Sequence, residues 1–190
     1  ILYSLWLYDQ NYQEQLSAEP VAGWFDYMER HGTHQATGLY VTEVVGVKKF
    51  SPIPRGCAHS YLCHYVGRFD RPRAEIIWEQ YKKHFLKRAF IGTGFREYPE
   101  DFKYRWTPDS GPILFGLGAA ATGIGINAAS TLDDAGTFKA IEQLLNRVDS
   151  GFGGIEKIIG SNLITRVATD FLATSIRLNA ETKSEWRLPA

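Results

Sequence analysis

The chain has 190 residues, of which 44% are hydrophobic and 14% aromatic, and equal numbers of basic and acidic side chains give a formal net charge of zero. A chain of this length can bury a substantial core as one domain, and its interspersed charges exclude the electrostatic pattern of a nucleic-acid-binding protein. Its two cysteines, Cys57 and Cys63, would lie too far apart on one helix to form a disulfide, so free thiols are expected.

The chain begins with two amphipathic stretches. Residues 1–16 spread apolar side chains over one wide helical face, and a second helix is predicted from a cap and first turn at 17–20 to His31, followed by Gly32. Because the chain starts inside a helical pattern without a capping residue, we expect a preceding segment in which a membrane anchor could lie. Leu5 and Trp6 would then belong to an apolar face that has lost its neighbours.

A long connection and two further helices are predicted next. Apolar and polar residues alternate from Gly38 to Val45, which indicates a small β-hairpin or an extended loop. One helix is expected at about 57–68, and Asp70 and Pro72 open another that runs through Phe90. Four basic residues are expected on a solvated face of that helix: Lys82, Lys83, Lys87 and Arg88.

The uncharged segment 110–127 follows a second long loop at 91–108 and admits three interpretations. Its length suits a membrane span, but its five glycines dilute the hydrophobicity and its flanks carry no basic cluster. The series Gly116-x-Gly118-x-x-Ala121 suits a dinucleotide loop, but no strand ending in an acid follows about 20 residues later. We therefore favour a tightly packed core helix, capped by Asp109 or Ser110 with Pro112 in its first turn.

Two helices complete the pattern. Asp133 and Asp134 are expected to cap a helix that ends near Val148, and a last helix is predicted from Leu163 to Leu178. Helix pairs that are joined alternately by short turns and long loops predict an all-α fold of antiparallel pairs, arranged as a partial α/α barrel or toroid. Short β-hairpins are expected only in the long loops, and residues 1–190 are expected to form a single domain.

Several short motifs support a family resemblance through their order along the chain. They are Leu5-Trp6-Leu7-Tyr8-Asp9, Trp24-Phe25-Asp26, Tyr81-Lys82-Lys83-His84-Phe85, Asp109-Ser110-Gly111 and Ala168-Thr169-Asp170-Phe171-Leu172-Ala173. With these motifs the chain resembles the C-terminal half of the linalool dehydratase/isomerase-like family. The resemblance implies an (α/α)6 barrel whose N-terminal half is missing here, lyase or isomerase activity, a bacterial source, and a periplasmic or membrane-associated location.

The resemblance does not carry over the catalytic residues of the family. The family's acid/base Asp, His and Cys residues belong largely to the half of the barrel that precedes this chain. Where the family has a Tyr on the loop before the third helix, this chain has Pro54-Arg55-Gly56-Cys57, so the substrate specificity is not transferred either.

The chain itself offers candidate site residues at two places. Arg55, Cys57, His59 and Tyr61 follow a proline-rich loop at a helix entrance, where side chains can face a barrel mouth. His59 and Cys63 share a helix face, but a metal site needs two further ligands, so we expect packing or hydrogen bonding there and no metal. No cofactor is predicted.

Glu97 and Asp109 flank the second long loop, which is rich in aromatic residues such as Tyr98 and Trp106. Two carboxylates that converge on one cavity can act as general acid and base, one of them kept protonated by an apolar wall. The alternative is that Asp109 only caps its helix and Glu97 pairs with Arg96 or Arg105 at the surface. The catalytic candidates are Asp109, Glu97, His59 and Arg55, and the substrate-binding candidates are Tyr61, Tyr98, Trp106 and Cys57.

An aromatic-lined barrel with carboxylates at its mouth predicts acid/base chemistry on a small apolar alcohol or a related ligand. Glycan hydrolysis is an alternative, because sugar rings stack on aromatic side chains and paired acids cleave glycosidic bonds. The third interpretation is a non-catalytic domain that binds a ligand or assembles with other chains, for example as a homo-oligomer.

Overall fold

The computed structural model describes residues 1–46, 49–100, 102, 110–152 and 174–182. Its helices are α1 (Leu2–Tyr12), α2 (Ala18–His31), α3 (Gly56–Val66), α4 (Arg71–Phe85), α5 (Ala119–Thr131) and α6 (Ala135–Phe152), and residues 174–182 are also helical. The strands pair as antiparallel hairpins, namely β1 (Val44–Gly46) with β2 (Lys49–Phe50), β3 (Leu86–Ala89) with β4 (Gly92–Phe95), and β5 (Ile113–Leu114) with β6 (Leu117–Gly118). The prediction of a mostly helical fold with a few short hairpins is confirmed, but of the described hairpins only β1–β2 lies wholly within a predicted long loop.

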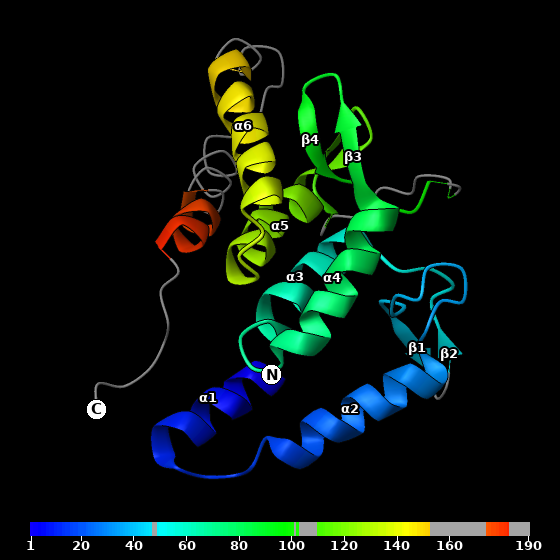
Figure 1. Ribbon diagram of the computed structural model, residues 1–190. Coiled ribbons are helices and arrows are strands. Elements are labelled where there is room, and N and C mark those ends of the chain that lie inside the picture. The colour runs from blue at the N-terminus through cyan, green and yellow to red at the C-terminus, as the bar shows by residue number, and fades with distance from the viewer. Residues whose placement is uncertain (47–48, 101, 103–109, 153–173, 183–190) are drawn as a thin grey trace, which may run out of the picture.

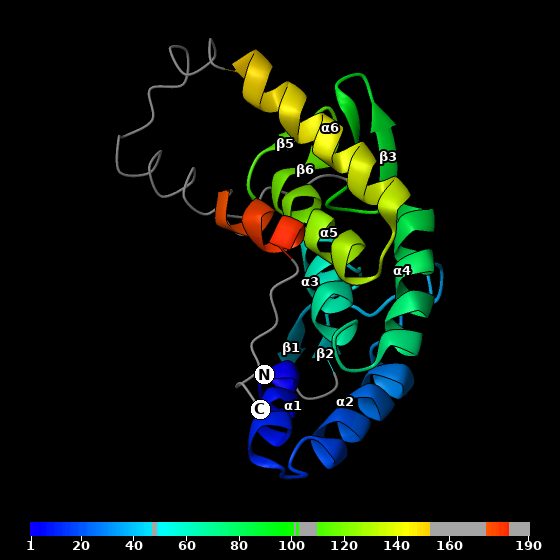
Figure 2. The ribbon, with the colours of Figure 1, turned by 60° about the vertical axis from the view of Figure 1, so that its left-hand side comes forward.

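The helices follow one another along the molecule in consecutive pairs (Figure 1). Both views place α1 and α2 at one end, α3 and α4 in the middle, and α5 and α6 at the other end (Figure 2). α3 packs most extensively against α5 and also contacts α4, which makes it the central helix of the described residues. The turn between α1 and α2 is closed by the Asp9 carboxylate, which accepts hydrogen bonds of 2.8 Å from the backbone N–H groups of Leu16 and Ser17.

α1 exposes much of its apolar surface. Ile1, Tyr8 and Tyr12 are all exposed, and Asp9 is the buried residue of this helix. A shallow hollow of about 440 Å³ lies on this face, lined by Ile1, Ser4, Leu5, Tyr8 and Leu16. The expected apolar face of the first helix is therefore present, with Leu5 and Trp6 only half-buried.

The core is an aromatic stack between α4, β4 and the small residues of α5. The rings of Tyr81 and Phe95 stack with centroids 4.4 Å apart, and Phe85 and Trp78 surround them. Gly125 lets α5 approach this stack, because a Cβ atom at this position would lie only 2.6 Å from the ring of Phe95. α5 is therefore a tightly packed helix, as predicted, and its contact face is centred on Ala121 and Gly125.

The fourth predicted helix was too long. α4 begins as expected, since the Asp70 carboxylate accepts from the Arg73 N–H and Pro72 lies in the first turn. It ends at Phe85, however, because Leu86 to Ala89 pair with Gly92 to Phe95 in a β-hairpin. Lys87 and Arg88 consequently lie on β3, whereas Lys82 lies on α4 and pairs with Glu79 and Asp134. The basic cluster is thus not one helical face.

The start of the small-residue helix was also predicted wrongly. Gly111, Phe115 and Gly116 have positive φ angles of 63°, 53° and 80°, and these fold residues 113–118 into the hairpin β5–β6. α5 therefore begins at Ala119 with Gly118 as its N-cap and no side-chain cap, so Ser110 does not cap it. Asp109 lies outside the described residues. The hairpin is antiparallel, which removes the strand–loop–helix context of a dinucleotide site.

α6 agrees with the prediction at its start. The Asp134 carboxylate accepts from the Thr137 N–H at 2.9 Å, as a helix cap does. The helix continues to Phe152, beyond the expected end near Val148. Of the last predicted helix, from Leu163 to Leu178, only the part from residue 174 lies within the described residues, and this part is helical. Among these same residues, no helix is both long and apolar enough to cross a membrane.

Two glycines of α5 provide a matched test of this packing. Gly125→Ala should lower the free energy of unfolding by about 1–3 kcal/mol, because the new methyl group overlaps the Phe95 ring. Gly123→Ala should raise it by about 0.5–1 kcal/mol, since nothing lies within 4 Å of the new methyl group and alanine favours a helix. Urea unfolding of both variants would measure the difference, and equal effects would contradict the assigned contact face.

Candidate functional site

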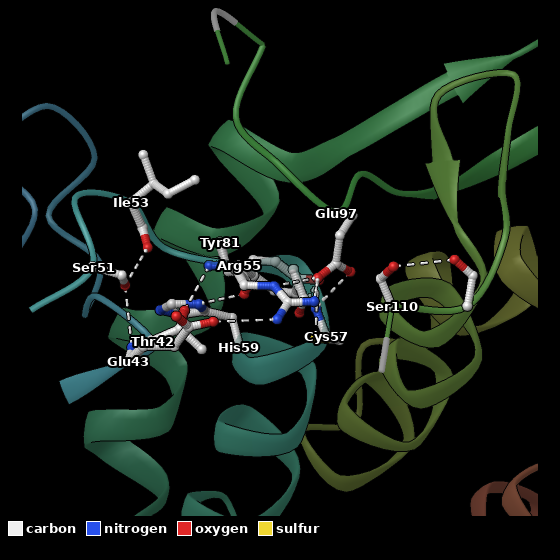
Figure 3. A network of polar contacts seen from close by, with 12 residues as sticks. Thr42, Glu43, Ser51, Ile53, Arg55, Cys57, His59, Tyr81, Glu97 and Ser110 are labelled. Atoms are coloured by element: carbon white, nitrogen blue, oxygen red, sulfur yellow. Dashed lines mark hydrogen bonds and ion pairs between the residues drawn. The ribbon is translucent and has the colours of Figure 1, made fainter. Parts of the chain in front are cut away.

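Glu97 lies two residues beyond β4 and is brought to the start of α3. Its residue exposure is only 1%, and Gly118 lies against it, so that a Cβ atom added at Gly118 would lie 3.1 Å from the Glu97 Cβ. A larger residue than glycine at position 118 would therefore displace the Glu97 side chain. The close-up in Figure 3 shows Glu97 pointing toward Arg55 and Cys57.

Glu97 caps the N-terminus of α3 from outside the helix. Its backbone carbonyl accepts from the Gly56 N–H at 2.8 Å, and its carboxylate Oε2 accepts from the Cys57 N–H at 3.2 Å. Arg55, the N-cap residue, has extended backbone and makes no capping hydrogen bond with its own side chain. A carboxylate at this position also interacts favourably with the positive end of the helix dipole.

Arg55 and Glu97 form a buried ion pair. The Arg55 Nε and Nη2 atoms both lie 2.9 Å from Glu97 Oε1, and the Arg55 side chain is 7% exposed. The Arg55 N–H donates to the Thr42 hydroxyl at 2.8 Å, and the Glu43 carboxylate lies 3.6 Å from Nη1. The loop before α3 is therefore tied to the same arginine (Figure 3).

The Cys57 thiol lies 3.1 Å from Glu97 Oε1, so a protonated thiol donates to the carboxylate. Burial raises the pKa of Glu97 above its usual value, although the hydrogen bonds and charge of Cys57 and Arg55 oppose this shift. Burial thus favours the protonated form of Glu97, whereas Arg55 and Cys57 favour its carboxylate form. In its protonated form, a buried carboxyl group of this kind can act as a general acid.

His59 lies one turn further along α3 and is 2% exposed. Its Nδ1 is 2.9 Å from the Arg55 carbonyl, which can only accept, so Nδ1 carries the proton and Nε2 presents a lone pair. Among the described residues Nε2 has no hydrogen-bond partner. Burial lowers the pKa of His59 to about 4, so the ring is neutral at physiological pH.

A pair of hydroxyl groups beneath the site was not recognised in the sequence. The Tyr81 hydroxyl donates to the Gly56 carbonyl at 2.9 Å, and Ser60 Oγ donates to the Ala121 carbonyl at 2.7 Å. The two hydroxyl oxygens are 2.9 Å apart. They join α3, α4 and α5 next to Gly56, whose N–H donates to Glu97. The two residues are 21 positions apart, so no local sequence pattern could have revealed the pair.

An aromatic strip extends from the site along α3 to α1. Tyr61 is 46% exposed and stacks parallel to Tyr65, with centroids 6.1 Å apart. Tyr3 lies 5.6 Å from Tyr65 and 5.9 Å from Trp6. Burial raises the pKa of Tyr61, with further contributions from Tyr65 and from Cys57, which lies one helical turn earlier. We call these four residues, Tyr3, Trp6, Tyr61 and Tyr65, the aromatic strip.

The structure brings several predicted site residues together. Arg55, Cys57 and Glu97 are in contact, His59 adjoins Arg55, and the Arg55 guanidinium lies 5.9 Å from the ring centroid of Tyr98, which is 8% exposed. Glu97 does not form the expected surface pair with Arg96, which pairs instead with Glu100. Trp106 and Asp109, like Arg105, lie outside the described residues.

The candidate metal pair of His59 and Cys63 gains no further ligands. In the described part of the chain, no group of three or more His, Cys, Asp or Glu side chains is arranged to hold a metal ion. Cys63 is fully buried, and burial raises the pKa of its thiol. Neither cysteine forms a disulfide, as predicted.

Comparisons of this chain with protein-family models, curated proteins and solved structures find no match.

Two carboxylates that face the same arginine allow a matched test of the ion pair. Glu97→Ala should lower the free energy of unfolding by about 3–5 kcal/mol, because it removes the buried partner of the Arg55 charge and the carboxylate that caps α3. Glu43→Ala should cost less than about 1 kcal/mol, since the Glu43 side chain is 53% exposed. Chemical denaturation of both variants would measure this, and similar losses would refute the assigned role of Glu97.

His59 predicts a pH dependence of stability. Its folded pKa of about 4 lies below the unfolded value of 6.5, so its contribution is complete above 6.5 and is lost as the pH falls toward 4. The expected loss is about 3 kcal/mol. His59→Phe, which keeps a ring against Tyr81 and Phe85, should flatten the dependence and leave the part due to His64, whose pKa burial also lowers to about 4. An unchanged pH profile would contradict a neutral, buried His59.

Proposed function

We propose that this chain carries an acid/base site for a small ligand with an apolar body and a hydroxyl group, of the lyase or isomerase type. The observation that carries the proposal is the Glu97 carboxyl group, which is buried beside Arg55 and Cys57 and has a raised pKa. We also propose that the consecutive helix pairs belong to an α/α toroid, with α3 among its inner helices.

In the proposed reaction the protonated form of Glu97 acts as the general acid. Glu97 gives its proton to the ligand hydroxyl. The carbon–oxygen bond then breaks, and the electron pair of this bond leaves with the water molecule. Asp109 takes a proton from the adjacent carbon, whose bonding electrons form the new double bond. The Glu97 carboxylate that remains is stabilised by donors already in place, the Arg55 guanidinium and the N–H of Cys57.

The aromatic strip supports the second element of the proposal, which is where the body of the ligand lies. Tyr61 is one helical turn from Cys57 and remains half-exposed, so a ring or branched hydrocarbon can stack on it. In this proposal the ligand hydroxyl lies at Glu97, which is 1% exposed, so the ligand has to displace part of the cover of this carboxyl group. The same strip favours glycan hydrolysis as a second candidate function, because sugar rings stack on tyrosine and tryptophan. The products distinguish the two candidates: an alkene and water, or two sugars.

A turnover assay with a panel of allylic and tertiary alcohols, followed by gas chromatography of the alkene products, tests the proposal. Glu97→Gln should abolish dehydration, since the amide has no acidic proton to give. Tyr61→Leu should raise KM about tenfold with little change in kcat, because it removes stacking that ligand and transition state share. Tyr12→Leu, at a tyrosine that is 59% exposed and outside the strip, is the matched control and should change neither constant.

Loss of turnover by Glu97→Gln counts only if the variant folds, so circular dichroism accompanies each assay. Cys57→Ser provides a second variant, because a hydroxyl keeps a donor toward Glu97 and should retain measurable turnover. Dehydration at the wild-type rate by folded Glu97→Gln would exclude Glu97 as the acid. Release of sugars from glycans, without alkene formation, would favour the second candidate.

A further inference from the structure

The hairpins β3–β4 and β5–β6 each present a phenylalanine at the tip. Phe90 and Phe115 occupy the first positions of two-residue turns and are 93% and 58% exposed. Their ring centroids are 6.5 Å apart, so the two tips lie together. Leu114, 40% exposed, adjoins Phe115. Figure 1 shows β3–β4 projecting from the body of the molecule beside α6.

The backbone at Phe115 has an unusual conformation. Phe115 and Gly116 have φ angles of 53° and 80°, as in the two-residue turns that favour Asn-Gly. A bulky residue with positive φ is an outlier that costs conformational energy. Here the residue gains little burial in return, since Phe115 is 58% exposed. A strained and exposed aromatic residue at a hairpin tip indicates a role outside the folding of the domain.

The charged residues of the two hairpins are all basic. Residues 86–95 and 111–118 contain Lys87 and Arg88 and no acidic residue, so the two hairpins together carry a formal charge of +2. Lys87 Nζ donates to the Phe115 carbonyl at 3.1 Å, which places its ammonium group beside the second tip. The Arg147 guanidinium of α6 lies 3.4 Å from the Ile91 carbonyl at the first tip.

We propose that Phe90, Phe115 and Leu114 insert into the interface of a membrane that contains anionic lipids. A narrow convex tip is poorly suited to a protein partner, since a stable interface buries about 800 Å² on each side. A fluid interface needs no complementary shape and accepts exposed aromatic side chains at the level of the headgroups. Lys87, Arg88 and Arg147 then lie where anionic headgroups attract them.

Cosedimentation of the 190-residue chain with lipid vesicles tests this. We expect binding to phosphatidylcholine vesicles that contain phosphatidylserine, weaker binding to phosphatidylcholine alone, and release as the salt concentration rises. The double variant Phe90→Ser/Phe115→Ser should lower the partition coefficient by about tenfold or more. Ile76→Ser, which removes an apolar side chain that is 69% exposed on α4, is the matched control and should bind like the wild type.

Phe115→Asn separates membrane binding from a structural role. Asparagine is preferred at this turn position, so this variant should raise the unfolding temperature while it weakens vesicle binding. A lower unfolding temperature would assign the ring to the fold and overturn the proposal.

Three results of the vesicle assay would also overturn it. They are failure of the wild-type chain to bind either vesicle, binding that the two phenylalanine substitutions leave unchanged, and Phe-dependent self-association in place of vesicle binding. The last result would assign the tips to a contact with a second copy. None of these outcomes depends on the acid/base function.

Discussion

The buried pair of Arg55 and Glu97 is the constraint on which the central part of the structure depends. Glu97 caps α3 with both its backbone carbonyl and its carboxylate, and Arg55 holds the loop of Thr42 and Glu43 against the same point. Two charges removed from water must each have several partners, or their desolvation outweighs their attraction. Here the arginine, the thiol and the helix N-terminus supply those partners, so the hairpin β3–β4 and α3 are fixed together.

The aromatic core contacts the start of α3 and so helps to hold the Arg55–Glu97 pair in place. Tyr81 stacks on Phe95 at the end of β4, and its hydroxyl donates to the carbonyl of Gly56, the first residue of α3. α5 closes over the stack because Gly125 has no side chain to meet the Phe95 ring. Gly118, immediately before α5, leaves room for Glu97. The residues that position the candidate acid and those that form the core are therefore largely the same residues or their neighbours.

The hairpin β3–β4 connects a buried and an exposed environment over a few residues. At its base, Phe95 is fully buried and Glu97 is almost so, whereas Phe90 at its tip is almost fully exposed. The base is needed for the candidate acid/base site, and the tip is the proposed point of membrane contact. Because a paired strand transmits its register along its length, the position of the tip follows from the packing of the base, and both regions depend on the same strand pairing.

The sequence by itself determined the elements that rest on local interactions. Asp70 and Asp134 cap their helices through residues three positions later, and Gly32 follows α2, so these boundaries could be read from short-range patterns. Tertiary structure alone decided that residues 86–89 form a strand, because their periodicity also suits a helix and only pairing with Gly92 to Phe95 distinguishes the two. The residue types of the candidate site were predicted, but the pairing of Arg55 with Glu97 spans 42 positions. No local pattern encodes such a contact, since it exists only when the packing of α3, β4 and α5 excludes water from both side chains.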